Sequence, residues 1–178
     1  MSKKLELKDY TFAALFTSII YVLGFVTIPL PFSPVPITGQ TLGVMLAGSM
    51  LTVRQAALSL GAFLLLGTAG VPFFAGGVGG LGIIAGPRGG YLVGFLFGAI
   101  IIALLKGKEN NIFRLGLANI IGGIVVIYIF GVIWLSHVMD LTLVKGFAVG
   151  ALPYLPGDFI KVVIAVAVSA KAGVYLRK

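Results

Sequence analysis

Asp158 and Lys161 are two charged residues in an otherwise apolar stretch near the end of this 178-residue chain. They stand three residues apart in the string PYLPGDFIK, so on a helix they share one face. Ionisable residues within an apolar span are costly, and they usually face a bundle interior or a wet cavity. Two interpretations stay open: an ion pair that satisfies itself and fixes the helix end, or a site for a polar ligand. Asp158 also follows Pro156 and Gly157, where a helix is expected to begin, so it is a candidate to cap free N–H groups.

Three further polar residues are expected at the same outer level of the molecule. Arg88 stands in GPRGGYL, and its planar guanidinium suits a carboxylate; the alternatives are contact with a lipid headgroup or pairing with Asp158 or Asp140. Gln40 and Thr41 open an expected helix. Their amide and hydroxyl can bind a neutral polar group, or they can cap that helix.

Other kinds of chemistry find little support in the sequence. The chain has no cysteine, which excludes disulfides and thiol catalysis, and its single histidine, His137, argues against a histidine-based metal cluster. No GxxxxGK[ST], HExxH or GxSxG string is present, so we expect neither an enzyme nor a protein that hydrolyses nucleotides itself. A GxGxxG match at Gly77 follows no strand and has no acidic residue at the required distance. We expect no cofactor and no metal.

The composition is that of an integral membrane protein. Hydrophobic residues make up 59% of the chain and charged residues 10%, against roughly 25% charged in an ordinary soluble domain. The mean hydropathy is +1.13. A small soluble fold leaves too much surface exposed to hide this apolar content. The formal charge of +8 is therefore better explained by a cytoplasmic membrane face than by nucleic acid.

The spacing of charges and prolines predicts six transmembrane helices. The uncharged run from Tyr10 to Val53 is too long for one span of about 20 residues, and the prolines of PLPFSPVP break it into two helices. The expected helices are one before Pro29 and others at roughly 39–53, 55–70, 90–105, 112–136 and 153–172. The second and third are short for a full crossing. The glycine-rich string that ends in GPRGG is expected to be a loop, and LTLVKGFAVGAL is expected to lie along the outer interface or to cover a cavity.

We therefore expect an all-α integral membrane bundle, with residues 1–178 forming a single domain. The basic flank of the first apolar stretch is also typical of signal peptides, but the stretch has no clear small-residue cleavage site and leads into the proline loop, so we expect a helix of the mature protein. Both termini are expected in the cytoplasm, because most basic residues then face inward. The inward residues are Lys3, Lys4, Lys8, Arg54, Lys106, Lys108, Arg114, Lys171, Arg177 and Lys178, whereas Arg88 and Lys145 face outward.

Small residues recur at helical spacing in three of the expected helices, where they allow backbones to approach. Two sets are expected to pack the bundle: Gly90, Gly94 and Gly98, and Gly39, Gly43 and Ala47. A third strip on the first helix either packs internally or meets a separate membrane subunit: Ala13, Ala14, Thr17 and Ser18.

Three strings occur in order along nearly the whole chain: PVPITGQTL, GVPFFAGGVGGLGIIAGPRGGYLVG and PYLPGDFIK. Together they resemble the BioY family, the biotin-specific substrate-capture (S) components of energy-coupling factor (ECF) transporters. The resemblance implies a six-helix bundle in the cytoplasmic membrane of a bacterium, which binds biotin near its outer face. It also implies a transmembrane scaffold subunit and two cytoplasmic ATPases as partners. Small residues on the first helix would contact the scaffold, either Ala14 with Ser18 or Ala13 with Thr17. Threonine is common in the family where this chain has Arg88.

The resemblance assigns hypothetical roles to the candidate site residues. Lys161 and Arg88 are the cations available to the carboxylate tail or the ureido oxygen of biotin, and Asp158 either accepts ureido N–H groups or orients Lys161. Gln40 and Thr41 would supply neutral hydrogen bonds. Aromatic walls are expected from Tyr91, Phe73, Phe74 and Tyr154. The glycine loop would form a lid. The alternatives are an S component for another small vitamin or a metal, biotin transport without the ECF module, and a structural membrane protein without a ligand.

Overall fold

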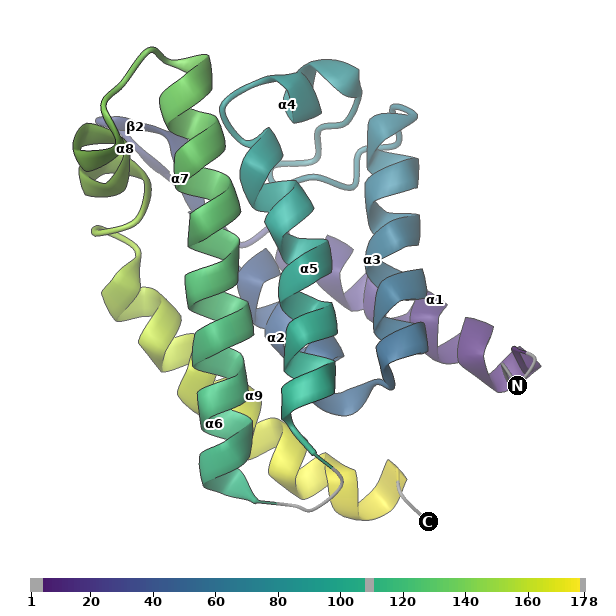
Figure 1. Cartoon of the computed structure of the whole chain (residues 1–178). Helices are drawn as coiled ribbons and strands as arrows, with labels where there is room; N and C mark the ends of the chain where they lie inside the picture. Colours follow the sequence, from purple (N-terminus) through teal and green to yellow (C-terminus); the bar gives the residue numbers. More distant parts are fainter. Residues whose placement is uncertain (1–4, 108–110, 177–178) are drawn as a thin grey trace.

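The protein is described from a computed structural model, which covers residues 5–107 and 111–176. Helix forms in every stretch for which the sequence predicts it (Figure 1). The long elements are α1 (Leu7–Leu23), α2 (Gln40–Met50), α3 (Val53–Thr68), α5 (Gly89–Leu105), the continuous helix formed by α6 (Ile112–Ile120), η1 (Ile121–Val126) and α7 (Ile127–Val138), and α9 (Leu155–Leu176). Two short helices were not expected: α4 (Leu81–Ala85) in the glycine loop and α8 (Leu143–Gly150) in the apolar segment after α7.

The helices differ in their ability to cross a membrane alone. Within the described ranges, the helix Ile112–Val138 is long and apolar enough to do so, with a mean hydropathy of 2.3. The pair α8 and α9 meets the same criterion together but is bent by 57°. Helices α3 and α5 are apolar and shorter. In the described part of the chain the fold is thus predominantly helical and apolar, and one continuous helix meets this criterion by itself.

The proline-rich segment is a β-hairpin, so the expectation of an irregular loop is wrong there. Strand β1 (Thr27–Leu30) pairs antiparallel with β2 (Ser33–Thr38), and Thr27 lies opposite Thr38. A two-stranded hairpin consists of two edge strands, and proline is tolerated there because an edge residue needs no ladder N–H. A register shift between Ile28 and Leu30 accompanies Pro29.

Glycines set the closest helix contacts, as the sequence predicts. A Cβ atom on Gly94 would lie 3.0 Å from the Cα of Ile127, and one on Gly98 would lie 2.5 Å from the carbonyl oxygen of Gly122. On α2, a Cβ on Gly43 would lie 2.9 Å from the side chain of Ile20. The glycine row of α5 therefore packs on η1 and α7, and that of α2 packs on α1.

Hydrogen bonds from buried polar side chains connect α1 to α3 and α6 to α2. Thr17 on α1 donates to the carbonyl oxygen of Ser59 on α3 at 2.9 Å. Asn119 on α6, which is fully buried, donates to the hydroxyl of Ser49 on α2 at 2.8 Å and to the carbonyl oxygen of Leu115 at 2.8 Å. In an apolar bundle these bonds fix which faces of the helices meet.

One end of the bundle gathers the irregular structure. The hairpin, α4 and α8 lie together at the top of Figure 1, whereas α5 ends and α6 begins at the bottom. The bottom end carries Lys106 and Arg114, which donate to the carbonyl oxygens of Leu51 and Leu105 and so satisfy the C-terminal ends of α2 and α5. Lys3, Lys4, Lys108, Arg177 and Lys178 lie outside the described residues.

Candidate functional site

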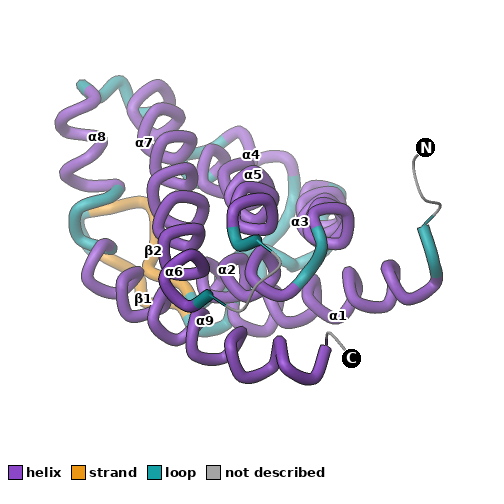
Figure 2. Tube along the Cα trace, turned by 60° about the horizontal axis from the view of Figure 1, so that its bottom comes forward, coloured by secondary structure: helices purple, strands orange, loops and turns teal. Residues whose placement is uncertain are grey.

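A cavity opens beneath the hairpin, between α2, α5, α7 and the first turn of α9. Its cavity volume is about 60 Å³, smaller than the ~300–1,000 Å³ typical of ligand pockets. Figure 2 shows the hairpin in orange between α8 and α9. The lining residues are Val35, Pro36, Thr38, Gln40, Thr41, Phe74, Ala75, Ile83, Arg88, Tyr91, Leu92, Phe95, Ile127, Tyr128, Gly150, Tyr154, Asp158 and Lys161.

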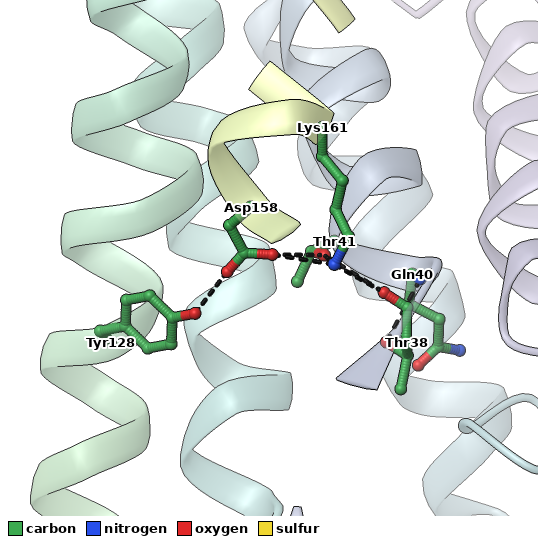
Figure 3. A network of polar contacts seen from close by, with 6 residues as sticks. All are labelled: Thr38, Gln40, Thr41, Tyr128, Asp158 and Lys161. Carbon is green, nitrogen blue, oxygen red and sulfur yellow. Dashed lines mark hydrogen bonds and ion pairs between the residues drawn. The ribbon is translucent and has the colours of Figure 1, made fainter. Parts of the chain in front are cut away.

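Asp158 and Lys161 form the polar centre of this cavity (Figure 3). The Nζ atom of Lys161 lies 2.8 Å from the Oδ1 atom of Asp158, and the two side chains are 15% and 4% exposed. Lys161 also donates to the carbonyl oxygen of Thr38 at 2.8 Å and to the hydroxyl of Thr41 at 2.8 Å. The Oδ2 atom of Asp158 accepts a hydrogen bond from the hydroxyl of Tyr128. The helical spacing therefore does bring the two charges onto one face, and that face points into the bundle.

The hydrogen-bonding groups of Lys161 and Asp158 differ in how fully they are occupied. An ammonium group has three hydrogens, and Lys161 has three acceptors around it. A carboxylate offers about four acceptor positions. Oδ1 of Asp158 serves Lys161 and, at 3.5 Å, the hydroxyl of Thr41, whereas Oδ2 serves Tyr128. One acceptor position on Oδ2 is thus left for a donor that enters the cavity.

Arg88 and Tyr154 hold the hairpin over the cavity. Nε of Arg88 donates to the carbonyl oxygen of Pro34 at 3.2 Å. A guanidinium has five N–H donors, so this hydrogen bond uses one of the five. The hydroxyl of Tyr154 contacts the hydroxyl of Ser33 at 2.8 Å and donates to the carbonyl oxygen of Val35. The side-chain partners of Asp158 are Lys161, Thr41 and Tyr128. The ion pair between Asp158 and Arg88, one of the alternatives from the sequence, is therefore not formed.

Gln40 attaches the glycine loop to α2. Its side chain is 1% exposed, and its amide nitrogen donates to the carbonyl oxygen of Phe73 at 3.0 Å. Neither Gln40 nor Thr41 caps α2, whose N-cap residue is Gly39. The ring of Phe73 does not line the cavity; it packs against Tyr21 and Phe63, with ring centroids 4.9 and 6.2 Å away. The neighbouring Phe74 does line it.

Eight of the nine expected site residues therefore surround one cavity, with Phe73 outside it. Among the lining residues not predicted from the sequence are Tyr128 and Phe95, which line the cavity from α7 and α5, and Thr38, whose backbone carbonyl oxygen accepts a hydrogen bond from Lys161. The two aromatic residues lie within long apolar stretches where no charge or breaker marks them. The polar tip of Tyr128 was the one available signal.

The strip of small residues on α1 is divided by the structure. Ala13 and Thr17 are 6% and 5% exposed and pack inward, whereas Ala14 and Ser18 are exposed on the outer face of the helix. The hydroxyl of Ser18 bonds to the carbonyl oxygen of Ala14 within the same helix at 3.0 Å. A surface for another membrane subunit is therefore available at Ala14 and Ser18 and not at Ala13 and Thr17.

Comparisons with known proteins agree on one family. The sequence pattern of the BioY family matches residues 1–178. The chain is 44% identical over 167 residues to a biotin transporter BioY of Rhizobium etli, covering 89% of each chain. It is 39% identical over 170 residues to a probable biotin transporter BioY of Bacillus subtilis, covering 94% of this chain and 91% of that one.

A solved structure has the same fold. The crystal structure of the S-component for biotin from an ECF-type ABC transporter superposes with a TM-score of 0.88 at 33% sequence identity, covering 96% of this chain and 93% of that one. By sequence and by structure, the chain belongs to the BioY family.

Proposed function

We propose that this protein captures biotin at the outer face of a bacterial cytoplasmic membrane and mediates its uptake as the S component of an ECF transporter. The observation that carries the proposal is the cavity itself, which joins the hydrogen-bonded pair of a buried Asp158 and a partly buried Lys161 to apolar and aromatic walls. An apolar pocket with a few polar anchors is what a small vitamin requires. The names of the family members and of the matched S-component support biotin as the ligand.

The parts of biotin correspond to different parts of the cavity. A ureido N–H group matches the acceptor position left on Oδ2 of Asp158, and the rings of Tyr91 and Phe95 offer walls to the thioether ring. The carboxylate tail matches Arg88, which keeps N–H donors beyond the one that it gives to Pro34. Gln40 and Thr41 would then support the polar end from α2.

The orientation and partners follow the same proposal. With the hairpin and glycine loop outside, the ends of α5 and α6 that carry Lys106 and Arg114 face the cytoplasm, and so do both termini. The chain is then a single six-helix domain with several membrane crossings and lipid around its exposed apolar faces. Transport energy would come from a transmembrane scaffold subunit and two cytoplasmic ATPases. The exposed strip of Ala14 and Ser18 is the surface we assign to the scaffold.

Labelled-biotin uptake in cells tests this proposal. The chain is produced in biotin-auxotrophic cells with and without the scaffold and ATPase subunits, and uptake is followed with unlabelled biotin or another vitamin as competitor. We expect uptake that biotin alone competes away and that rises with the energising module. If a different vitamin competes and unlabelled biotin does not, biotin is not the ligand. If uptake is identical without the scaffold and ATPase subunits, these subunits are not the partners that energise it.

A further inference from the structure

The long helix between Ile112 and Val138 contains one wide turn. Residues Ile121–Val126 form a π-helix between the α-helical segments α6 and α7, and all its parts belong to one continuous rod (Figure 1). Such a turn holds one residue more than an α-helical turn, and it occurs often beside functional sites. The turn ends directly before Ile127 and Tyr128, two residues that line the cavity.

The wide turn changes which way Tyr128 faces relative to α6. Asn119 faces α2, where it bonds to Ser49. Tyr128 lies nine positions after Asn119, and at about 100° per residue in a regular helix the two side chains would lie on opposite sides of the rod. One extra residue in the turn brings the angle to about 80°. Asn119 and Tyr128 thus both face the interior of the bundle.

Close packing holds the wide turn in place. A Cβ atom on Gly122 would lie 2.6 Å from the carbonyl oxygen of Gly98 on α5, and one on Gly123 would lie 2.8 Å from the side chain of Met45 on α2. Because both glycines fit against neighbouring helices, the turn is locked from two sides. The direction of Tyr128 is therefore built into the packing of the helices.

Tyr128 approaches Asp158 from the side opposite Lys161. Its hydroxyl donates to Oδ2, whereas Lys161 holds Oδ1 (Figure 3). The ring packs edge-to-face on Tyr91, with ring centroids 6.4 Å apart. Two donors on different oxygens prevent the carboxylate from rotating, which a single ion pair would not do.

We propose that Tyr128, aimed by the π-helical turn, is a positioning residue that fixes the Asp158 carboxylate for the incoming ligand. This inference rests on the proposed function, because it assigns a role within the same biotin site. Lys161 supplies the opposite charge and Tyr128 fixes the orientation of the Asp158 carboxylate, so that the remaining acceptor position on Oδ2 points into the cavity. A charge-assisted hydrogen bond is among the stronger ones in proteins, so its loss should weaken biotin binding about tenfold to a hundredfold.

The test compares Tyr128→Phe with Tyr91→Phe. Both variants remove one hydroxyl from the cavity wall, but the hydroxyl of Tyr91 bonds to the carbonyl oxygen of Gly150 at 2.8 Å and not to Asp158. The carboxylate stretching bands are recorded by infrared spectroscopy on ligand-free protein labelled with 13C at the aspartate carboxyl carbon. Biotin affinity is then measured on the same samples.

We expect Tyr128→Phe to shift an aspartate band that Tyr91→Phe leaves in place, and to weaken biotin binding at least about tenfold. An unchanged aspartate band in Tyr128→Phe overturns the inference, and so does a shifted band with unchanged affinity. Failure of the unmodified protein to bind biotin would instead refute the proposed function, and the spectra of the ligand-free samples would still report whether Tyr128 holds Asp158.

Discussion

Gly122 is the position at which the packing of the π-helical turn is most open to a quantitative test. A Cβ atom there would lie 2.6 Å from the carbonyl oxygen of Gly98, 2.6 Å from Cγ1 of Ile102 and 3.0 Å from the backbone nitrogen of Ile102. Two of these three neighbours are backbone atoms of α5, which cannot rotate away. The Gly122→Ala variant must therefore push the long helix away from α5.

The free energy of unfolding should fall as a result. Overpacking a close contact costs about 1–3 kcal/mol, and the higher helix propensity of alanine offsets at most about 1 kcal/mol of this. Gly116→Ala is the matched control: it lies on the same long helix, and a Cβ atom there meets nothing within 4 Å. We expect this control to be neutral or to gain up to about 1 kcal/mol.

Thermal unfolding in detergent, followed by the fluorescence of the single tryptophan, Trp134, measures the difference between the two variants. The expected order of unfolding temperature is Gly116→Ala, then the unmodified protein, then Gly122→Ala. If Gly122→Ala unfolds at the same temperature as Gly116→Ala, the close packing of η1 on α5 is wrong, and with it the account of how Tyr128 is aimed.

Two further predictions concern polar contacts between helices. Thr17→Val removes the hydrogen bond to Ser59 and should destabilise the isolated protein by roughly 0.6–2 kcal/mol. Ser18→Val loses only a hydrogen bond within its own helix, so it should leave the thermal unfolding temperature nearly unchanged and weaken co-purification with the scaffold subunit. The reverse pattern would contradict the assignment of the two faces of α1. Asn119→Leu leaves the hydroxyl of Ser49 without its partner and should lower the free energy of unfolding by about 1–3 kcal/mol in denaturant titration, and a variant as stable as the unmodified protein would show that this bond does not hold α6 against α2.

The helices and much of the site could be predicted from the sequence because rare residues carry the information in an apolar chain. Asp158, Lys161 and Arg88 are conspicuous by their charge, and all three line the cavity. The proline-rich segment shows the limit of this reasoning: proline excludes a helix interior, but it does not distinguish an irregular loop from an edge strand. The hairpin backbone also accepts hydrogen bonds from Tyr154 and Arg88, which lie far along the chain.

The contribution of Tyr128 could not be predicted from periodicity. A regular helix from Ile112 onward would turn Tyr128 about 180° away from the side that Asn119 occupies, so the expected pattern gives the wrong face. In the π-helical turn, Gly122 and Gly123 pack closely on α5 and α2, and these contacts between distant segments are not visible in the periodicity of the sequence. Similarly, the sequence offers Ala13, Ala14, Thr17 and Ser18 as equal candidates for a partner surface, and only the packing of α1 on α3 separates them.

The central claim, that the cavity around Asp158 and Lys161 binds biotin, is tested most directly by titrating biotin into the purified protein and into the Asp158→Ala/Lys161→Ala double variant. Removing both residues avoids leaving one buried charge without its partner, so a change in affinity is not caused by an unpaired charge. We predict saturable binding of one biotin per chain by the unmodified protein and loss of high-affinity binding in the double variant. Equal biotin affinity in the two proteins would contradict the account.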